Sequence, residues 1–257
     1  MIMIRNLFAA AIFAALAAGL LTAAIQHFRV TPLILHAETF EGEGGGHSHG
    51  EAAADHVDAA GTADHSHDAV ALTAEDEAEE WAPADGFERT AYTTLATVLA
   101  AAGFALVIGA VSMFSGIPIT FANGFLWGIA GFVAFSLAPA YGLAPELPGM
   151  PAADVLPRQI WWVGTALATG AAWLLLAKTR AGWAFAVAAA LVVIPHIIGA
   201  PGAPDEPSAV PAHLATEFAA ITLGTSLVFW LVLGTLFGKL NDVFARNRVA
   251  VPAGATA

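Results

Sequence analysis

The chain has no cysteine and only two lysines, and charged residues make up 12% of its 257 residues. Without thiols it cannot form disulfides, cysteine-ligated metal sites or iron–sulfur clusters, and it cannot use a cysteine nucleophile. Neither lysine lies in the G-x-x-x-x-G-K-[ST] pattern of phosphate-binding loops, so ATP binding of that kind is excluded. No basic patch is present, which argues against nucleic acid as a partner.

Charge is missing altogether from residues 90–145, which contain no Asp, Glu, Lys, Arg or His. Hydrophobic residues make up 58% of the chain, and soluble domains carry about 25% charged residues, roughly twice the share found here. The sequence therefore predicts an all-α, polytopic transmembrane helix bundle of about six spans, because roughly 20 apolar residues cross a bilayer. The predicted spans are 7–28, 90–113, 119–138, 159–178, 182–199 and 216–237.

Basic residues set the expected orientation, because they favour the cytoplasmic side. With both termini inside, six basic residues lie on the inner side (Arg5, Lys178, Arg180, Lys239, Arg246 and Arg248) and three on the outer side (Arg29, Arg89 and Arg158). The predicted segments are a first helix with an outer extension (1–40), a disordered His- and acid-rich outer loop (41–88), a bundle of about five helices (89–240) and a disordered cytoplasmic tail (241–257). A cleaved signal peptide at the N-terminus is an alternative that would leave five spans.

Two further outer loops, 139–158 and 200–213, are rich in proline and are expected to form stiff, non-helical caps over the bundle. Arg158 is expected to pair with Glu146 or Asp154 across the first of these caps. Such a pair would hold the loop over the helices.

The outer loop carries the clearest chemical signal in the sequence. The stretch GEGGGHSHGEAAADHVDAAGTADHSHD holds five histidines among acidic residues, namely His47, His49, His56, His65 and His67. Imidazole and carboxylate groups on a flexible chain bind divalent transition metals, and these donors suit Co(II), Ni(II), Zn(II) and Cu(II) without choosing among them. A solvated charged loop with incidental histidines is the plainer alternative.

A second set of candidate metal ligands lies at the expected outer ends of the helices: His36, Glu38, Glu146, His196 and His213. His27 and Glu217 lie near them. Ionisable groups close to hydrocarbon are costly and are often functional. These residues could form a funnel from the outer loop into the bundle, although groups at helix ends can also serve only as interfacial anchors.

Five motifs in order resemble the CbtA family of proposed cobalt transporter subunits: HFRVTPLILHAETFE at 27–41, LAPELPGMPAAD at 143–154, RQIWWVGTALATG at 158–170, IPHIIGAP at 194–201 and VPAHLATEF at 210–218. The family is described with five spans, against the six counted here. The resemblance implies Co(II) uptake for cobalamin synthesis in a bacterial inner membrane. It also implies a small partner with one span and its own histidines, the CbtB-like subunit.

The leading hypothesis is therefore a non-enzymatic subunit of a divalent-metal transporter, with Co(II) as the cargo, Ni(II) or Zn(II) as alternatives, and no tightly bound cofactor. A homo-oligomer is compatible with the sequence. Two other functions stay open. One is a membrane redox protein that ligates haem through His27, His196 or His213, and the other is a non-transporting metal sensor or chaperone at the outer surface.

Overall fold

The structure, a computed structural model, describes residues 2–44, 83–84 and 86–246, and every regular element in these ranges is helical. The elements in chain order are α1 (Ile2–Ile25), the π-helical segment η1 (Gln26–Val30), α2 (Thr31–Gly44), α3 (Phe87–Ser115), α4 (Phe121–Phe132), the π-helical segment η2 (Val133–Leu137), α5 (Ala138–Gly142), α6 (Val155–Lys178), α7 (Gly182–Ile198) and α8 (Ala212–Arg246). The predicted all-α membrane bundle is confirmed.

Five helical stretches among the described residues are long and apolar enough to cross a membrane: Ile4–Phe40, Phe87–Ser115, Phe121–Gly142, Val155–Lys178 and Ala212–Arg246. The span predicted at 182–199 forms α7, which has 17 residues. At about 1.5 Å per residue, α7 is about 26 Å long, slightly less than a hydrocarbon layer of about 30 Å. The sixth predicted span is therefore a shorter apolar helix, paired with α6.

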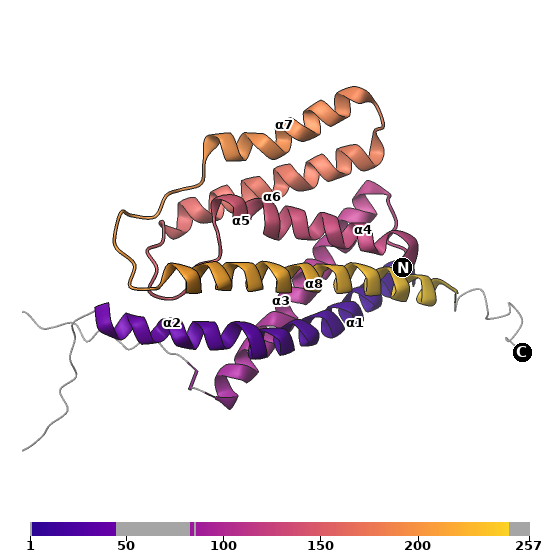
Figure 1. The fold of residues 1–257 in the computed structure, drawn as a ribbon. Helices are drawn as coiled ribbons and strands as arrows, with labels where there is room; N and C mark the ends of the chain where they lie inside the picture. Colours follow the sequence, from indigo (N-terminus) through magenta and orange to yellow (C-terminus); the bar gives the residue numbers. More distant parts are fainter. Residues whose placement is uncertain (1, 45–82, 85, 247–257) are drawn as a thin grey trace, which may run out of the picture.

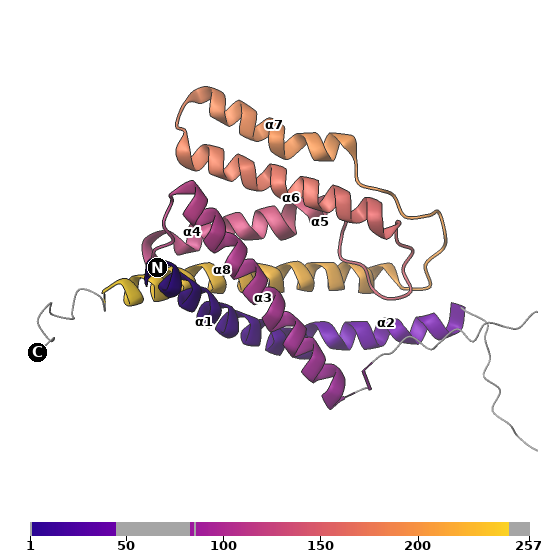
Figure 2. The ribbon, with the colours of Figure 1, turned by 180° about the vertical axis from the view of Figure 1, so that it is seen from behind.

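Helix α8 lies at the centre of the bundle, in contact with α1 and α4 (Figures 1 and 2). Its buried side chains Trp230, Leu233 and Phe237 pack in one apolar cluster with Ile108 of α3 and with five alanines of α1. These alanines are Ala10, Ala11, Ala14, Ala15 and Ala18. Because their spacing places them on one helix face, α1 presents a flat surface that neighbouring helices can approach closely.

Glycines bring α4 and α8 into backbone contact. A Cβ atom added to Gly128 would lie 2.5 Å from the carbonyl oxygen of Trp230, and one added to Gly234 would lie 2.6 Å from the nitrogen of Gly128. Gly124 and Gly238 likewise face backbone atoms across this interface. In both helices the glycines are four residues apart, the small-xxx-small spacing that allows close helix packing in membranes.

Each π-helical segment ends two residues before a proline. In η2 the amide of Ala138 donates to the carbonyl of Val133, five residues earlier. Pro139 comes next, and in a regular α-helix its ring would collide with the carbonyl of Phe135. The wider π turn relieves this collision, and η1 precedes Pro32 in the same way. Both helices therefore continue past their prolines.

We call the end of the bundle where α5 ends and α6 begins the Glu146 end, and the end where α6 is followed by α7 the Lys178 end. They lie at the left and right of Figure 1. At the Lys178 end the carboxylate of Asp242 accepts a hydrogen bond from the amide of Phe121 at 2.9 Å. The Asn241 side chain donates to the carbonyl of Ile119 at 2.8 Å. These bonds hold the end of α8 against the α3–α4 corner. Helix α8 continues to Arg246, into the segment 241–257 that is expected to form the tail.

At the Glu146 end the two proline-rich loops pack onto helices. Leu147 and Val210, one from each loop, are buried in an apolar cluster with residues of η1, α2 and α8. The first loop is shorter than predicted, because helix extends to Gly142 and begins again at Val155. The hairpin of α6 and α7 adjoins α5 and η2, on the side of the bundle away from α1 (Figure 1).

Candidate functional site

The structure places His36, Glu38, Glu146, His196 and His213 at one end of the bundle, the Glu146 end (Figure 1). They come from α2, the loop before α6, the last turn of α7 and the first turn of α8. The other candidates (His47, His49, His56, His65 and His67) lie outside the described residues.

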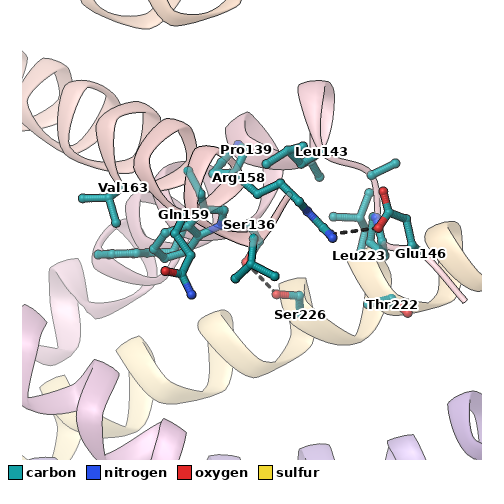
Figure 3. A pocket seen from close by; sticks show the side chains of 16 residues that line it. Ser136, Pro139, Leu143, Glu146, Arg158, Gln159, Val163, Thr222, Leu223 and Ser226 are labelled. Carbon is teal, nitrogen blue, oxygen red and sulfur yellow. Dashed lines mark hydrogen bonds and ion pairs between the residues drawn. The ribbon is translucent and has the colours of Figure 1, made fainter. Parts of the chain in front are cut away.

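A cavity of about 680 Å³ opens at this end between η2 and α5, α6 and α8 (Figure 3). Its walls combine apolar side chains, such as Leu143, Trp162 and Val163, with a smaller number of polar ones. The polar lining consists of Ser136, Glu146, Arg158, Gln159, Thr222 and Ser226. A mostly apolar cavity with a few convergent polar groups is the usual form of a small-ligand site.

Glu146 and Arg158 form an ion pair in the wall of this cavity. The Arg158 Nη2 atom donates to the Glu146 Oε2 atom at 2.8 Å, and the two side chains are 30% and 24% exposed. Of the two pairings expected for Arg158, the structure therefore confirms the one with Glu146. Ion pairs that solvent reaches contribute only about 0–1 kcal/mol to stability, and both of these side chains are partly exposed. The Glu146 carboxylate can therefore exchange its partner at little cost.

Three hydroxyl groups and the Gln159 side chain form the rest of the polar wall. Trp230 Nε1 donates to Ser136 Oγ at 3.2 Å, and the hydroxyls of Ser136 and Ser226 lie 2.7 Å apart. Ser136 belongs to η2, so the wide turn before Pro139 is the segment that presents it to α8. Thr222 is four residues before Ser226 on the same face of α8, and its buried hydroxyl has no hydrogen-bond partner. The wall thus offers neutral oxygen atoms beside the carboxylate.

Glu38 lies in a separate ion pair. Its Oε2 atom accepts from Arg89 Nη1 at 3.3 Å, and its Oε1 atom contacts Arg89 Nη2, which ties α2 to the start of α3. The neighbouring His36 is exposed, and its ring centroid is 5.4 Å from that of Phe40. Neither Glu38 nor His36 lines the cavity at Glu146.

His196 contacts aromatic rings. Its ring lies edge to face with Tyr141 and Trp161, at centroid distances of 5.2 and 5.7 Å. The Trp161 Nε1 atom donates to the carbonyl of Pro195 at 3.1 Å, and the buried His196 Nδ1 atom has no hydrogen-bond partner. A side chain on Gly142 would collide with the Trp161 ring. These contacts join the α6–α7 hairpin to α5, which favours a packing role for His196.

The candidate ligands do not meet in one place. Among the described residues no group of three or more His, Asp or Glu side chains is close enough to hold a metal ion. His213 is exposed on the first turn of α8, and His27 is exposed on η1. The structure thus brings the described candidate ligands to one end of the bundle, but apart from His36 and Glu38, which share α2, it keeps them on separate elements.

The residues that sequence reasoning missed are the neutral ones in the cavity wall: Ser136, Gln159, Thr222 and Ser226. Serine and threonine are common in membrane helices, where they often bond to their own backbone, so their presence gave no signal. The one usable hint was Thr222 and Ser226, two hydroxyls four residues apart in an apolar run.

Comparison with known protein families decides the class of this bundle. The family model described as "Probable cobalt transporter subunit (CbtA)" matches residues 4–242, nearly the whole chain. The chain belongs to the CbtA family. The match covers all or most of every described helix of the CbtA bundle, together with Glu146 and Arg158. No curated protein and no solved structure matches the chain.

Membership of the CbtA family makes the chain a probable cobalt transporter subunit, and its long apolar helices make it a multi-pass membrane protein. The term subunit also implies that the chain works with a partner.

Proposed function

We propose that the chain takes up Co(II) across a bacterial inner membrane and that the cavity at Glu146 lies on the path of the ion. The observation that supports this assignment most directly is a carboxylate in the wall of a cavity at the end of the bundle where the candidate ligands gather. The Glu146 end would face the outside, because Arg5, Lys178 and Lys239 lie at the opposite end.

The chemistry of the cavity suits passage of an ion. One carboxylate and several neutral oxygens can replace a part of the water shell of a divalent cation, while water keeps the remaining positions. Conduction needs binding that is favourable enough for the ion to enter and weak enough for it to leave. A cavity with a single carboxylate meets this requirement better than a closed cage of histidines.

In this proposal the five histidines of the outer loop capture Co(II) and raise its concentration near the cavity. Imidazole binds Co(II) more selectively than oxygen donors do, so the tract would supply the metal preference that the cavity wall lacks. A small single-span, histidine-containing subunit of the CbtB type would complete the transporter. The cobalt would serve cobalamin synthesis.

The overall test is uptake of radioactive Co(II) by cells that express the chain together with such a partner. The proposal expects saturable uptake well above that of cells with an empty vector, with Ni(II) and Zn(II) as weaker competitors. Reconstitution of the pair in liposomes then separates transport from surface binding, since a sensor or chaperone would bind the metal and show no flux. Absence of flux in both systems would reject the proposal.

Changing all five tract histidines to serine should affect capture and leave passage intact. We expect the apparent KM for Co(II) to rise by at least about threefold, because the local concentration of the ion falls, while the maximal rate stays the same. Initial uptake rates over a range of Co(II) concentrations measure both quantities. A fall in maximal rate with unchanged KM would place the tract in passage instead.

Two changes at His196 separate packing from metal binding. His196→Phe keeps a ring against Trp161 and removes the unpartnered Nδ1 atom, so we expect near-normal uptake and thermal stability. His196→Ala should lower both uptake and stability, because it leaves a gap beside two aromatic rings. The expected loss in the free energy of unfolding is about 1–3 kcal/mol. Loss of uptake in a stable His196→Phe variant would instead make the imidazole a metal ligand.

A further inference from the structure

Arg158 occupies the carboxylate of Glu146 with a cation that belongs to the chain itself. The two partners are anchored differently. Glu146 precedes Leu147, which is 3% exposed and packs in the apolar cluster of α2 and α8, so its backbone is held in place. Arg158 reaches across from the first turn of α6 with a long side chain that is 30% exposed. Of the two, Arg158 is the partner that can swing away.

The surroundings leave room for this movement. The ion pair lines a cavity of about 680 Å³ that also contains Gln159 and the hydroxyls of Thr222 and Ser226 (Figure 3). These groups can accept hydrogen bonds from a displaced guanidinium or from the water shell of an ion. The unpartnered hydroxyl of Thr222 is available for such a bond.

We propose that Arg158 is a tethered competitor of the transported dication: it neutralises Glu146 while the cavity is empty, and the arriving metal ion displaces it. This inference rests on the proposed function, since it assumes that Co(II) reaches Glu146. Arg158 then regulates how often the Glu146 carboxylate holds the metal ion. It weakens the binding of the metal, and by returning to the carboxylate it promotes release.

The charge of the ion explains why a dication can displace Arg158, whereas a monovalent ion gains no free energy by doing so. Exchanging one single positive charge for another leaves the attraction to the carboxylate nearly unchanged, whereas a double charge roughly doubles it. The pair being displaced is partly exposed and contributes at most about fivefold to an equilibrium constant. The exchange therefore favours divalent cargo over the monovalent cations that are abundant outside a cell.

The test compares Arg158→Gln with Arg158→Lys, both in the full-length chain with the five tract histidines changed to serine, which removes metal binding by the tract imidazoles. Equilibrium dialysis of the purified protein with radioactive Co(II) should show binding that is tighter for Arg158→Gln than for the parent by up to about fivefold. Arg158→Lys keeps the competing charge and should restore the parent affinity. Arg89→Gln is the matched control, because Arg89 has the same 30% exposure and its carboxylate partner does not line this cavity.

Uptake in the presence of the partner subunit gives a second readout. Arg158→Gln should lower both the apparent KM and the maximal rate, because the ion binds more tightly and leaves more slowly. A merely structural role would lower the maximal rate without lowering KM.

Binding by Arg158→Gln that is no tighter than that by Arg158→Lys would overturn this inference. If Glu146→Gln also binds Co(II) as the parent does, the assignment of the cavity fails as well; if Glu146→Gln loses binding, only the role of Arg158 is rejected.

Discussion

Changing Glu146 to glutamine is expected to reduce Co(II) uptake at low metal concentration by at least about thirtyfold. Two unit charges 4 Å apart attract by about 1 kcal/mol in water and about 4 kcal/mol near a protein surface, and the double charge of Co(II) doubles these values. Even the lower value, about 2 kcal/mol, corresponds to roughly a thirtyfold change in an equilibrium constant. Glutamine has nearly the same size and leaves the loop anchored by Leu147. Initial rates of radioactive Co(II) uptake measure the effect.

Asp154→Asn is the matched control for this change. Asp154 precedes α6 one turn before Arg158, so it also carries a negative charge at the Glu146 end, but its side chain is exposed and does not line the cavity. We expect this variant to transport within about twofold of the unmodified chain, because solvent screens an exposed charge. Equal losses in the two variants would show that net charge at this end drives uptake, and would contradict a specific role for Glu146.

Changing Gly234 to leucine is expected to destabilise the folded bundle by more than about 3 kcal/mol. The new Cβ atom would collide with the backbone of α4 at Gly124 and Gly128, and rigid backbone on both sides cannot give way as a flexible side chain can. Helices α4 and α8 would have to separate along the interface that fixes the cavity. Thermal unfolding in detergent, followed by the loss of the monodisperse peak in size-exclusion chromatography, measures this effect.

Gly224→Leu supplies the control on the same helix. Gly224 has no atom within 4 Å of an added Cβ atom, so the same substitution meets open space. We expect Gly224→Leu to raise the free energy of unfolding slightly, because leucine favours helix more than glycine does. Similar destabilisation by the two variants would mean that leucine in place of any glycine of α8 destabilises the bundle, and that close contact with α4 is not the cause.

The helices could be predicted because their signal is local. Long runs without charge mark spans, and the run predicted at 182–199 corresponds closely to α7. The apolar runs did not show whether a helix ends at a proline. The proline-rich loop was expected to begin at residue 139, yet the helix continues through Pro139, since the π turn before it accommodates the ring. Proline is a weaker helix breaker in membranes, where no water competes for the backbone.

The site was predictable only in part, because its polar groups come from distant segments. Arg158 and Glu146 are close in sequence and opposite in charge, so their pairing could be foreseen. Ser136 and Ser226 are 90 residues apart, and their contact depends on how η2 meets α8. Metal-ligating residue types also drew attention to His36 and His196, which the structure places away from the cavity. Residue type indicates what a side chain can bind, but packing decides which side chains share a cavity.

The central place of α8 has a consequence for how the protein is made. Because α8 follows the other described helices in the chain and contacts both α1 and α4, the core cannot close until α8 has been synthesised. Until then the glycine face of α4 and the part of α1 that contacts α8 remain uncovered in the membrane. Termination before α8 would leave a nascent chain that is inserted but unassembled, and such chains are substrates for membrane quality control.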